Sequence, residues 1–305
     1  MKKLIPKLLI LFIIFYLVSI CIFLGLDFMA KSVYTGENGG FQNYIINNEF
    51  DYLLMGSSRT RKHLDRKTIF PDKNSANAGV NGQTFYHHGL LINCLLQNYT
   101  PKQIILNIDF SDIFIIESQE PKSSVNLFLP FINNPYVFEK VKKFNSTLFA
   151  CLIKFYHLSR YTYRFRFLSI IENYFIDKSK PDIDYDPQDK IMDEHYKKNI
   201  KPLDFLGIDK DKIQVLREII IICQKKDIKL ILLVQPSYGI KGEYTKKMAE
   251  ILKDFTNDEI KLLRYDKFVD PDFDNENLFY DRSHMNRQGA NMISKKIADD
   301  IKGLF

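Results

Sequence analysis

Five short runs of apolar or small residues most constrain the fold of this chain. They occupy residues 51–55, 74–80, 103–108, 228–234 and 260–265. Runs of this length and composition are typical of strands that are buried on both faces. Stretches with helical spacing lie at residues 84–99, 213–225, 244–255 and 285–304. The alternation predicts an α/β domain whose parallel sheet is covered by helices on both faces.

An uncharged apolar stretch, residues 8–26, precedes these runs. As a helix it would be about 28 Å long, enough to cross the hydrocarbon core of a bilayer. Lys2, Lys3 and Lys7 come before it, and such a basic flank stays in the cytoplasm. A cleaved signal peptide is the rival, but the run is long for one and no small-residue cleavage motif follows.

We therefore predict an N-terminal transmembrane helix within residues 1–30, an uncleaved anchor surrounded by membrane lipid. The protein would be a single-pass protein of the cell membrane with a cytoplasmic N-terminus. Everything after Asp27 would then be extracytoplasmic. The net charge of +6 is modest, so together with this location we expect no nucleic acid as a partner.

The strand–helix alternation breaks between residues 110 and 209, which are rich in Phe, Tyr, Lys and Arg. We predict a mainly helical insertion here, within a sheet domain that spans residues 48–305. Residues 154–167 (KFYHLSRYTYRFRF) interleave basic and aromatic side chains. This pattern fits three environments: a membrane interface, a glycan stacked on the rings, or an ordinary amphipathic helix with Arg facing water.

A serine directly follows the first predicted strand, in Gly56-Ser57-Ser58-Arg59. Ser58 would project from the carboxyl end of the sheet, where ligands of such folds bind. Backbone N–H groups of the helix that starts there would face a developing oxyanion. Taken alone, the motif is more typical of a Gly-Ser turn or a helix cap.

Near the C-terminus, Asp281 precedes His284 by three residues. In one turn, the carboxylate would accept a hydrogen bond from one ring nitrogen and leave the other free to take a proton from a serine. The alternative is a helix-capping Asp beside an exposed His. At the end of the second strand, Gly82 can offer its N–H to an oxyanion, with Asn81 or Gln83 as a further donor.

Together these segments resemble the sequence blocks of the SGNH/GDSL hydrolase superfamily. Gly56-Ser57-Ser58 stands where the first block has its nucleophile, residues 77–84 resemble the second block, and Asp281 with His284 matches the last. The resemblance covers about residues 48–110 and 205–305. It implies a flavodoxin-like three-layer α/β/α sandwich and a serine mechanism without metal or cofactor. The implied catalytic residues are Ser58, His284 and Asp281, and the implied oxyanion groups are Ser58, Gly82 and Asn81.

The chain departs from the family at two positions. Ser57 replaces the usual Asp of the first block, which does not take part in the chemistry. In the third block, Asp109 or Asp112 stands where an Asn amide is expected, and an ionised carboxylate repels an oxyanion.

A similarly weakened third block occurs in membrane-anchored members that modify cell-surface polymers. They include proteins like the D-alanine transfer protein of teichoic acid synthesis and the alginate acetylation proteins. The resemblance to this subgroup implies a cell-envelope polysaccharide, or its acyl ester, as substrate. It also implies a multi-spanning membrane protein as acyl donor.

Three further residues are expected to contact substrate. Arg59 would hold a carboxylate or phosphate, or else form a surface salt bridge. Gln235 should lie at the pocket rim after the strand at residues 228–234, and Asp109 follows the third strand. His63, His87 and His88 are expected to be structural or at the surface, since no two histidines stand with carboxylates at metal spacing.

The sequence thus predicts an extracytoplasmic serine esterase or O-acyltransferase that forms an acyl-serine intermediate. The alternative is a non-catalytic protein of the same fold that binds glycan or assists assembly.

Overall fold

The computed structural model describes residues 4–32, 40–115, 121–162, 166–176, 185–193, 205–238 and 240–304. Lys2, Lys3 and parts of the predicted 110–209 insertion (116–120, 163–165, 177–184 and 194–204) lie outside the described residues. The chain divides into two compact units. The helical unit combines Met1–Asn48 with Glu120–Pro181, and the sheet unit combines Glu49–Gln119 with Asp182–Phe305.

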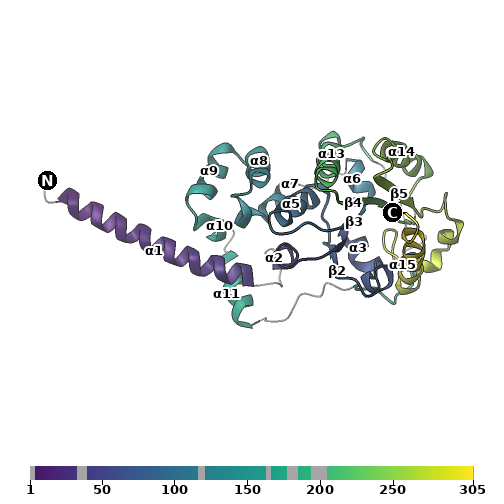
Figure 1. Ribbon diagram of the computed structural model, residues 1–305, viewed down its shortest axis with the longest axis horizontal. Coiled ribbons are helices and arrows are strands. Elements are labelled where there is room, and N and C mark those ends of the chain that lie inside the picture. Colours follow the sequence, from purple (N-terminus) through teal and green to yellow (C-terminus); the bar gives the residue numbers. More distant parts are fainter. Residues whose placement is uncertain are drawn as a thin grey trace. The chain divides into compact units, whose positions relative to one another are not determined.

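The sheet unit is built on five parallel strands in the order β2-β1-β3-β4-β5 (Figure 1). The strands are β1 (Tyr52–Gly56), β2 (Ser75–Gly79), β3 (Gln103–Asn107), β4 (Lys229–Val234) and β5 (Ile260–Arg264). Each predicted run coincides with one of them to within one residue at either end. The strand order is that of flavodoxin-like sheets.

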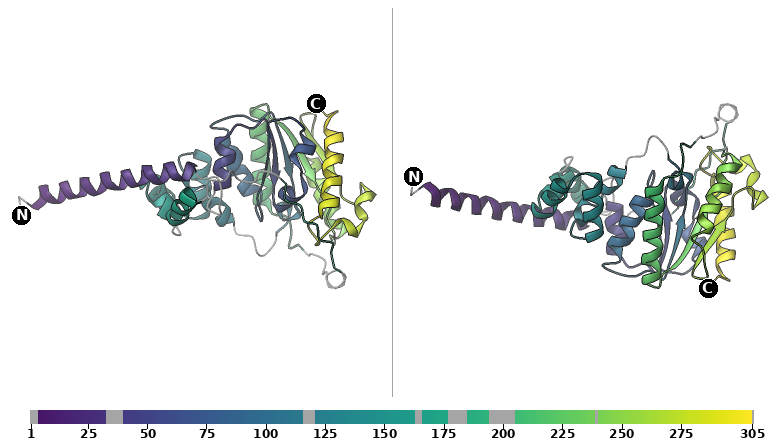
Figure 2. Two further views of the ribbon diagram at one scale, coloured as in Figure 1. Left: turned by 90° about the horizontal axis from the view of Figure 1, so that it is seen from below. Right: turned by 90° about the horizontal axis from the view of Figure 1, so that it is seen from above.

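Helices cover both faces of this sheet, so the predicted three-layer α/β/α sandwich is confirmed. On one face α5 (Phe85–Leu95) packs against α13 (Lys210–Lys225). On the other, α15 (Arg287–Ile301) packs against α3 (Ser58–His63) and α4 (Arg66–Ile69). Figure 2 shows α13 in green and α15 in yellow on opposite sides of the strands. The other helices that the structure describes in this unit are α6 (Phe110–Ile113), α14 (Gly242–Lys253), η3 (Pro271–Asp274) and η4 (Glu276–Leu278).

The last helix begins later than its apolar pattern predicts, at Arg287 rather than at Met285. The side chain of Asn286 accepts a hydrogen bond from the Gly289 N–H and so caps the helix. Met285 instead forms an antiparallel bridge with Phe279. The residues just before it, including His284, therefore lie in a loop and not on a helix.

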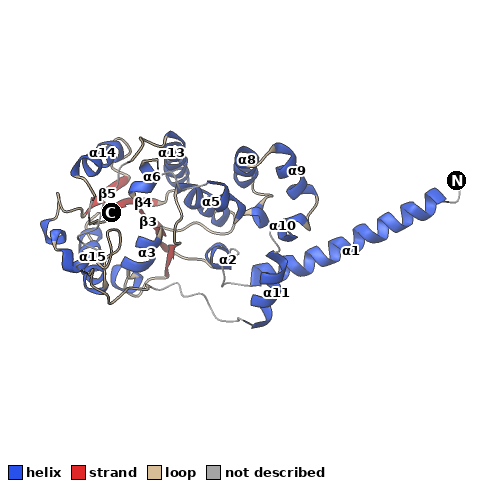
Figure 3. Cartoon of the chain, turned by 180° about the vertical axis from the view of Figure 1, so that it is seen from behind, coloured by secondary structure: helices blue, strands red, loops and turns tan. Residues whose placement is uncertain are grey.

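All secondary structure described in the helical unit is helical (Figure 3). It comprises α1 (Leu4–Ser32), α2 (Gly40–Asn47), α7 (Pro121–Asn126), η1 (Leu129–Phe131), α8 (Pro135–Phe144), α9 (Thr147–Phe155), α10 (Ser159–Thr162) and α11 (Arg166–Ile176). The Leu4–Ala30 part of α1, 27 residues, is long and apolar enough to cross a membrane. This coincides with the predicted anchor.

The turn from β1 into α3 requires a glycine at position 56. Gly56 has φ +153°, and a Cβ there would lie 2.1 Å from Thr60 Oγ1 and 2.9 Å from Asn107 Cβ. We expect Gly56→Ala to lower the free energy of unfolding by about 3 kcal/mol or more, because backbone strain and steric overlap add. Urea unfolding of the detergent-solubilised chain measures this loss.

Gly82→Ala is the matched control. Gly82 also has positive φ, +68°, but no atom lies within 4 Å of a Cβ built there. Only the backbone cost of about 1–2 kcal/mol should then appear. Equal losses in the two variants would contradict a packing role for Gly56.

Candidate active site

Ser58 lies at the carboxyl end of β1 as the first residue of α3. The preceding Ser57 caps the helix, and its hydroxyl accepts a hydrogen bond from the Arg59 N–H at 3.3 Å. The N–H of Ser58 stands in the first turn, where a helix has no acceptor of its own. Within the described part of the chain this N–H donates no hydrogen bond, so it is available to an oxyanion.

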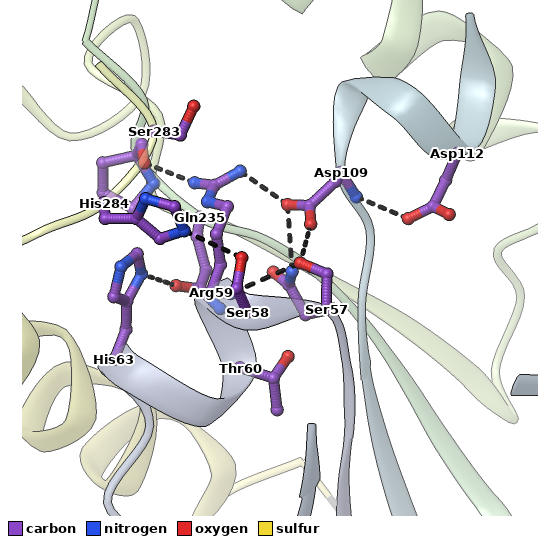
Figure 4. Close-up of polar contacts among 12 residues, drawn as sticks. Ser57, Ser58, Arg59, Thr60, His63, Asp109, Asp112, Gln235, Ser283 and His284 are labelled. Atoms are coloured by element: carbon purple, nitrogen blue, oxygen red, sulfur yellow. Dashed lines mark hydrogen bonds and ion pairs between the residues drawn. The ribbon is translucent and has the colours of Figure 1, made fainter. Parts of the chain in front are cut away.

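Ser58, His284 and Asp281 form one hydrogen-bonded line, of which Figure 4 shows the Ser58–His284 part. Ser58 Oγ lies 2.8 Å from His284 Nε2. His284 Nδ1 lies 2.8 Å and 3.1 Å from the two carboxylate oxygens of Asp281. Since a carboxylate accepts at Nδ1, that nitrogen carries the ring proton and Nε2 accepts from the serine hydroxyl. The predicted proximity of these three side chains is present in the structure.

The Asp281 carboxylate is held by its own loop. Its Oδ1 accepts hydrogen bonds from the backbone N–H groups of Ser283 at 2.7 Å and His284 at 2.8 Å. Partial burial opposes ionisation, but the hydrogen bond from the His284 ring and these backbone N–H groups outweigh it. The pKa of Asp281 is therefore held below its ordinary value, and an ionised Asp281 orients the imidazole.

A second histidine, His63 of α3, positions the loop that carries His284. Its Nε2 accepts the backbone N–H of Met285 at 2.9 Å. The ring proton must then be on Nδ1, which donates to Gln235 Oε1 at 2.7 Å. Burial, followed by the nearby charge of Arg59, lowers the pKa of His63 well below its ordinary value. The neutral ring thus links α3 to Gln235, which follows β4, and to the loop that carries His284.

Arg59 and Asp109 form a buried ion pair beside the catalytic line (Figure 4). Arg59 Nη1 lies 2.8 Å from Asp109 Oδ1, and Nη2 donates to the Pro236 carbonyl. The carboxylate also accepts from the Ser57 hydroxyl and, at 3.2 Å, from the Asn107 amide. The surface salt bridge considered for Arg59 is wrong, since its side chain is only 5% exposed. The charge of Asp109 is therefore matched by a guanidinium.

A cavity of about 310 Å³ opens over Ser58. Its lining includes Ser58, His284, Gly82, Arg59 and Asp109. Gly82 is one of these lining residues, and its N–H donates no hydrogen bond within the described residues. The apolar side of the cavity is formed by Phe110, Phe205 and Ile240.

Two predicted site residues do not line this cavity. Asn81 is exposed and is not among the described lining residues, whereas both Gly82 and Gln83, the alternative donor to Asn81, line the cavity. Gln235 is 1% exposed and its side chain is directed to His63. Its predicted place at the pocket rim is therefore wrong.

One positioning residue escapes sequence reasoning altogether. Asn77, in the middle of the buried strand β2, donates from Nδ2 to the carbonyls of Thr60 at 2.9 Å and Leu64 at 2.8 Å. These are acceptors at the end of α3, so Asn77 holds the helix that begins with Ser58. An amide in a buried strand needs buried partners, and that is the signal by which it could be found. His63, expected to be structural or at the surface, contacts the backbone next to His284 only because the fold brings distant segments together.

The buried histidines should make the stability of the fold depend on pH. Burial lowers the pKa of His63 and His87 well below the ordinary 6.5 and that of His88 to about 4. Burial, with the adjacent Asp109, raises the pKa of Asp112 to about 8. Below pH 6.5 the three histidines become protonated in the unfolded chain but stay neutral in the folded chain. Asp112 has the opposite effect, because its carboxyl is protonated in the folded chain and ionised in the unfolded one.

For these four groups the net difference is about two protons, so they should make the free energy of unfolding fall by about 3 kcal/mol per pH unit between pH 6 and 5. Above pH 6.5 the contribution of the histidines is fully present. Urea unfolding across this range measures the slope, and His88→Gln should reduce it by about 1.4 kcal/mol per pH unit. A stability that is flat or rises towards pH 5 would contradict this account.

Comparison with known proteins adds little to this geometry. No protein-family model matches the sequence, and no curated protein sequence matches it. Among solved structures, the chain is similar to a protein from Bacteroides fragilis described as "a putative acylhydrolase". The two are 13% identical with a TM-score of 0.45, over 88% of this chain and 96% of that one. Because both values are low, the functional conclusion rests on the site itself.

Proposed function

We propose that this chain is a membrane-anchored serine esterase or O-acyltransferase that acts through an acyl-Ser58 intermediate. The observation that carries the proposal is the 2.8 Å contact of Ser58 Oγ with His284 Nε2, with Asp281 on the other ring nitrogen. This arrangement of hydroxyl, imidazole and carboxylate is the one that activates a serine for acyl transfer. The cavity above it gives an ester access to the hydroxyl.

In the proposed mechanism, His284 Nε2 takes the hydroxyl proton while Ser58 Oγ attacks the ester carbonyl. The resulting oxyanion accepts hydrogen bonds from the N–H groups of Ser58 and Gly82. His284 then gives its proton to the departing alcohol, and acyl-Ser58 remains. Water or a sugar hydroxyl next transfers a proton to Nε2 and attacks the acyl carbon. As the bond between the acyl carbon and Ser58 Oγ breaks, His284 returns this proton to Ser58 Oγ.

The unusual third block is compatible with this chemistry. Loss of one oxyanion donor costs about 3–4 kcal/mol in transition-state stabilisation, so two backbone donors retain much of the effect. Asp109 is paired with Arg59 at 2.8 Å, and this pairing offsets the repulsion that its charge would exert on the oxyanion.

The proposed substrate is an acyl ester of a cell-envelope polysaccharide. The apolar wall that includes Phe110 and Phe205 suits an acyl chain, and the family resemblance supports the glycan and an acyl-donor membrane protein as partners. The apolar helix α1 supports a membrane location. The basic residues before it favour a cytoplasmic N-terminus and an extracytoplasmic sheet unit.

Hydrolysis of an activated aryl acetate by the detergent-solubilised chain tests the proposal. Ser58→Ala should abolish turnover. Ser32→Ala is the matched control and should retain turnover, because Ser32 lies near the end of α1, where its hydroxyl donates to the Phe28 carbonyl. Added glycan that accelerates release of the aryl alcohol would identify a transferase. Turnover that is absent in wild type, or unchanged in Ser58→Ala, would favour the glycan-binding or assembly alternative.

A further inference from the structure

Two helices of the helical unit carry exposed apolar stripes. On α9, Leu148, Leu152 and Phe155 are 79%, 48% and 73% exposed. On α11, Leu168, Ile171 and Phe175 are 57%, 37% and 65% exposed. Within each helix the spacing of three or four residues places these side chains along one face.

Both helices also bury apolar side chains on another face. Ala150 and Ile153 of α9 and Ile170 of α11 are buried. A water-facing helix is normally polar opposite its buried stripe, whereas a helix apolar on more than one side is typical of a nonaqueous surrounding. Contiguous exposed apolar surface on a protein marks an interaction site.

Within the helical unit, residues of α10 and α11 pack on α1 near the end of its apolar run. Tyr161 of α10 and Ile170 of α11 form a buried cluster with Leu26 and Ala30 of α1, and both short helices lie along this part of α1 (Figure 1). The Tyr161 hydroxyl donates to Asp27 Oδ1 at 2.6 Å. Asp27, the first acidic side chain after the uncharged run of residues 8–26, therefore accepts a hydrogen bond from α10.

The packing continues into the uncharged run itself. The ring of Phe23 stacks on His157 with centroids 5.0 Å apart, and the Arg160 guanidinium lies 5.4 Å from the Phe23 centroid. Phe23 precedes Asp27 by four residues. Along the axis of α1 it therefore lies about 6 Å further into the predicted membrane span than Asp27 does. Amphipathic helices at a membrane surface bury their apolar face by about 5–10 Å. The distance of about 6 Å between Asp27 and Phe23 falls within this range.

The hydrogen bonds of Arg160 suit a segment in contact with lipid. The residue is 3% exposed and donates to the carbonyls of Ile153 and Lys154, both at 3.2 Å, and to Asn133 Oδ1 at 3.0 Å. The predicted alternative in which the arginines of this segment face water is wrong for Arg160. It satisfies the last carbonyls of α9 internally, as a segment in contact with lipid requires.

We propose that α9, α10 and α11 are also embedded in the membrane, with the apolar stripes of α9 and α11 in the outer leaflet beside α1. The inference rests on the proposed anchoring by α1 and adds a second lipid contact to it. α8 and α9 of the same unit also carry Lys142, Lys143 and Lys154, and basic side chains near a membrane surface are attracted to anionic lipid headgroups. The competing occupants of the stripes are a second copy of the chain and a membrane-protein partner.

The chain contains no Trp, so each introduced Trp is a single fluorescent reporter. The full-length protein would be reconstituted into vesicles of phosphatidylcholine and phosphatidylglycerol, with or without brominated acyl chains that quench Trp on contact. Phe155→Trp and Phe175→Trp report on the stripes. Phe12→Trp, 69% exposed on α1, reports on the span, and Phe268→Trp, 57% exposed in the sheet unit, gives the reference for an exposed aromatic.

Bromolipid should quench the emission of Phe155→Trp and Phe175→Trp nearly as strongly as that of Phe12→Trp, and both should emit at shorter wavelength than Phe268→Trp. Emission of the two stripe reporters that is blue-shifted but unquenched would overturn the proposal in favour of a protein partner or a second copy. Water-like, unquenched emission from both would also overturn it. If Phe12→Trp is not quenched either, the proposed anchoring fails, and this is distinguishable from failure of the stripes alone.

Discussion

Replacing His284 by alanine should lower kcat/KM for an activated aryl ester by about 10⁴-fold or more, because Ser58 loses the base that takes its proton. Asp281→Asn should cost about 10³–10⁴-fold. Its amide no longer holds the proton on Nδ1, so Nε2 ceases to be the free acceptor. The Ser58→Ala/His284→Ala double variant should be no worse than either single variant, since the groups act as a unit.

Two controls separate chemistry from folding. Asp299→Asn should retain wild-type kinetics, because this exposed carboxylate pairs with Lys302 on the surface. Added imidazole should partly restore turnover in His284→Ala, because it can occupy the vacated space as a base. If His284→Ala and Asp281→Asn kept wild-type kcat/KM, the proposed proton path would be excluded.

The second large effect concerns stability rather than catalysis. Asp109→Ala should lower the free energy of unfolding by about 3–5 kcal/mol, because it leaves the buried Arg59 charge without its partner. The Arg59→Met/Asp109→Leu double variant, which removes both charges, should recover most of that loss. Urea unfolding of both variants measures the difference.

The matched control is an ion pair on the surface. Lys102 and Asp51 lie 3.1 Å apart with side chains 67% and 39% exposed, so Asp51→Ala should cost only about 0–1 kcal/mol. A double variant at Arg59 and Asp109 that is less stable than Asp109→Ala would contradict the view that burial of an unmatched charge causes the loss.

The sheet could be predicted because its signal is local. Buried strands such as β3 and β4 are continuous apolar runs, and the helices between them have apolar spacing. The Asp281–His284 pair is local too, since both residues lie in one turn. Ser58 could be placed because it directly follows a strand whose carboxyl end must lie at the sheet edge.

The support around the site could not be predicted, because it depends on side chains brought together from distant parts of the chain. His63 meets Met285, 222 positions later, and Arg59 meets Asp109, 50 positions later. The wrong placement of Gln235 has the same origin. The residue does follow β4 directly, as predicted, but the sequence does not reveal that its side chain bonds the buried His63.

The helical unit was the least predictable part of the fold. Its helices carry apolar residues on several faces, so no periodicity distinguishes the side that packs on α1 from the side that stays exposed. Arg160 illustrates this: its basic character predicts a water-facing position, whereas it caps α9 internally.

The central claim is that Ser58 is the nucleophile, and covalent trapping tests it most directly. The full-length chain would be treated with a fluorophosphonate, which reacts with activated serines, and the modified peptide identified by mass spectrometry. The account predicts one adduct, on Ser58 and not on the adjacent Ser57, that disappears in His284→Ala. An adduct on another serine, or none in folded wild-type protein that also lacks esterase activity, would contradict it.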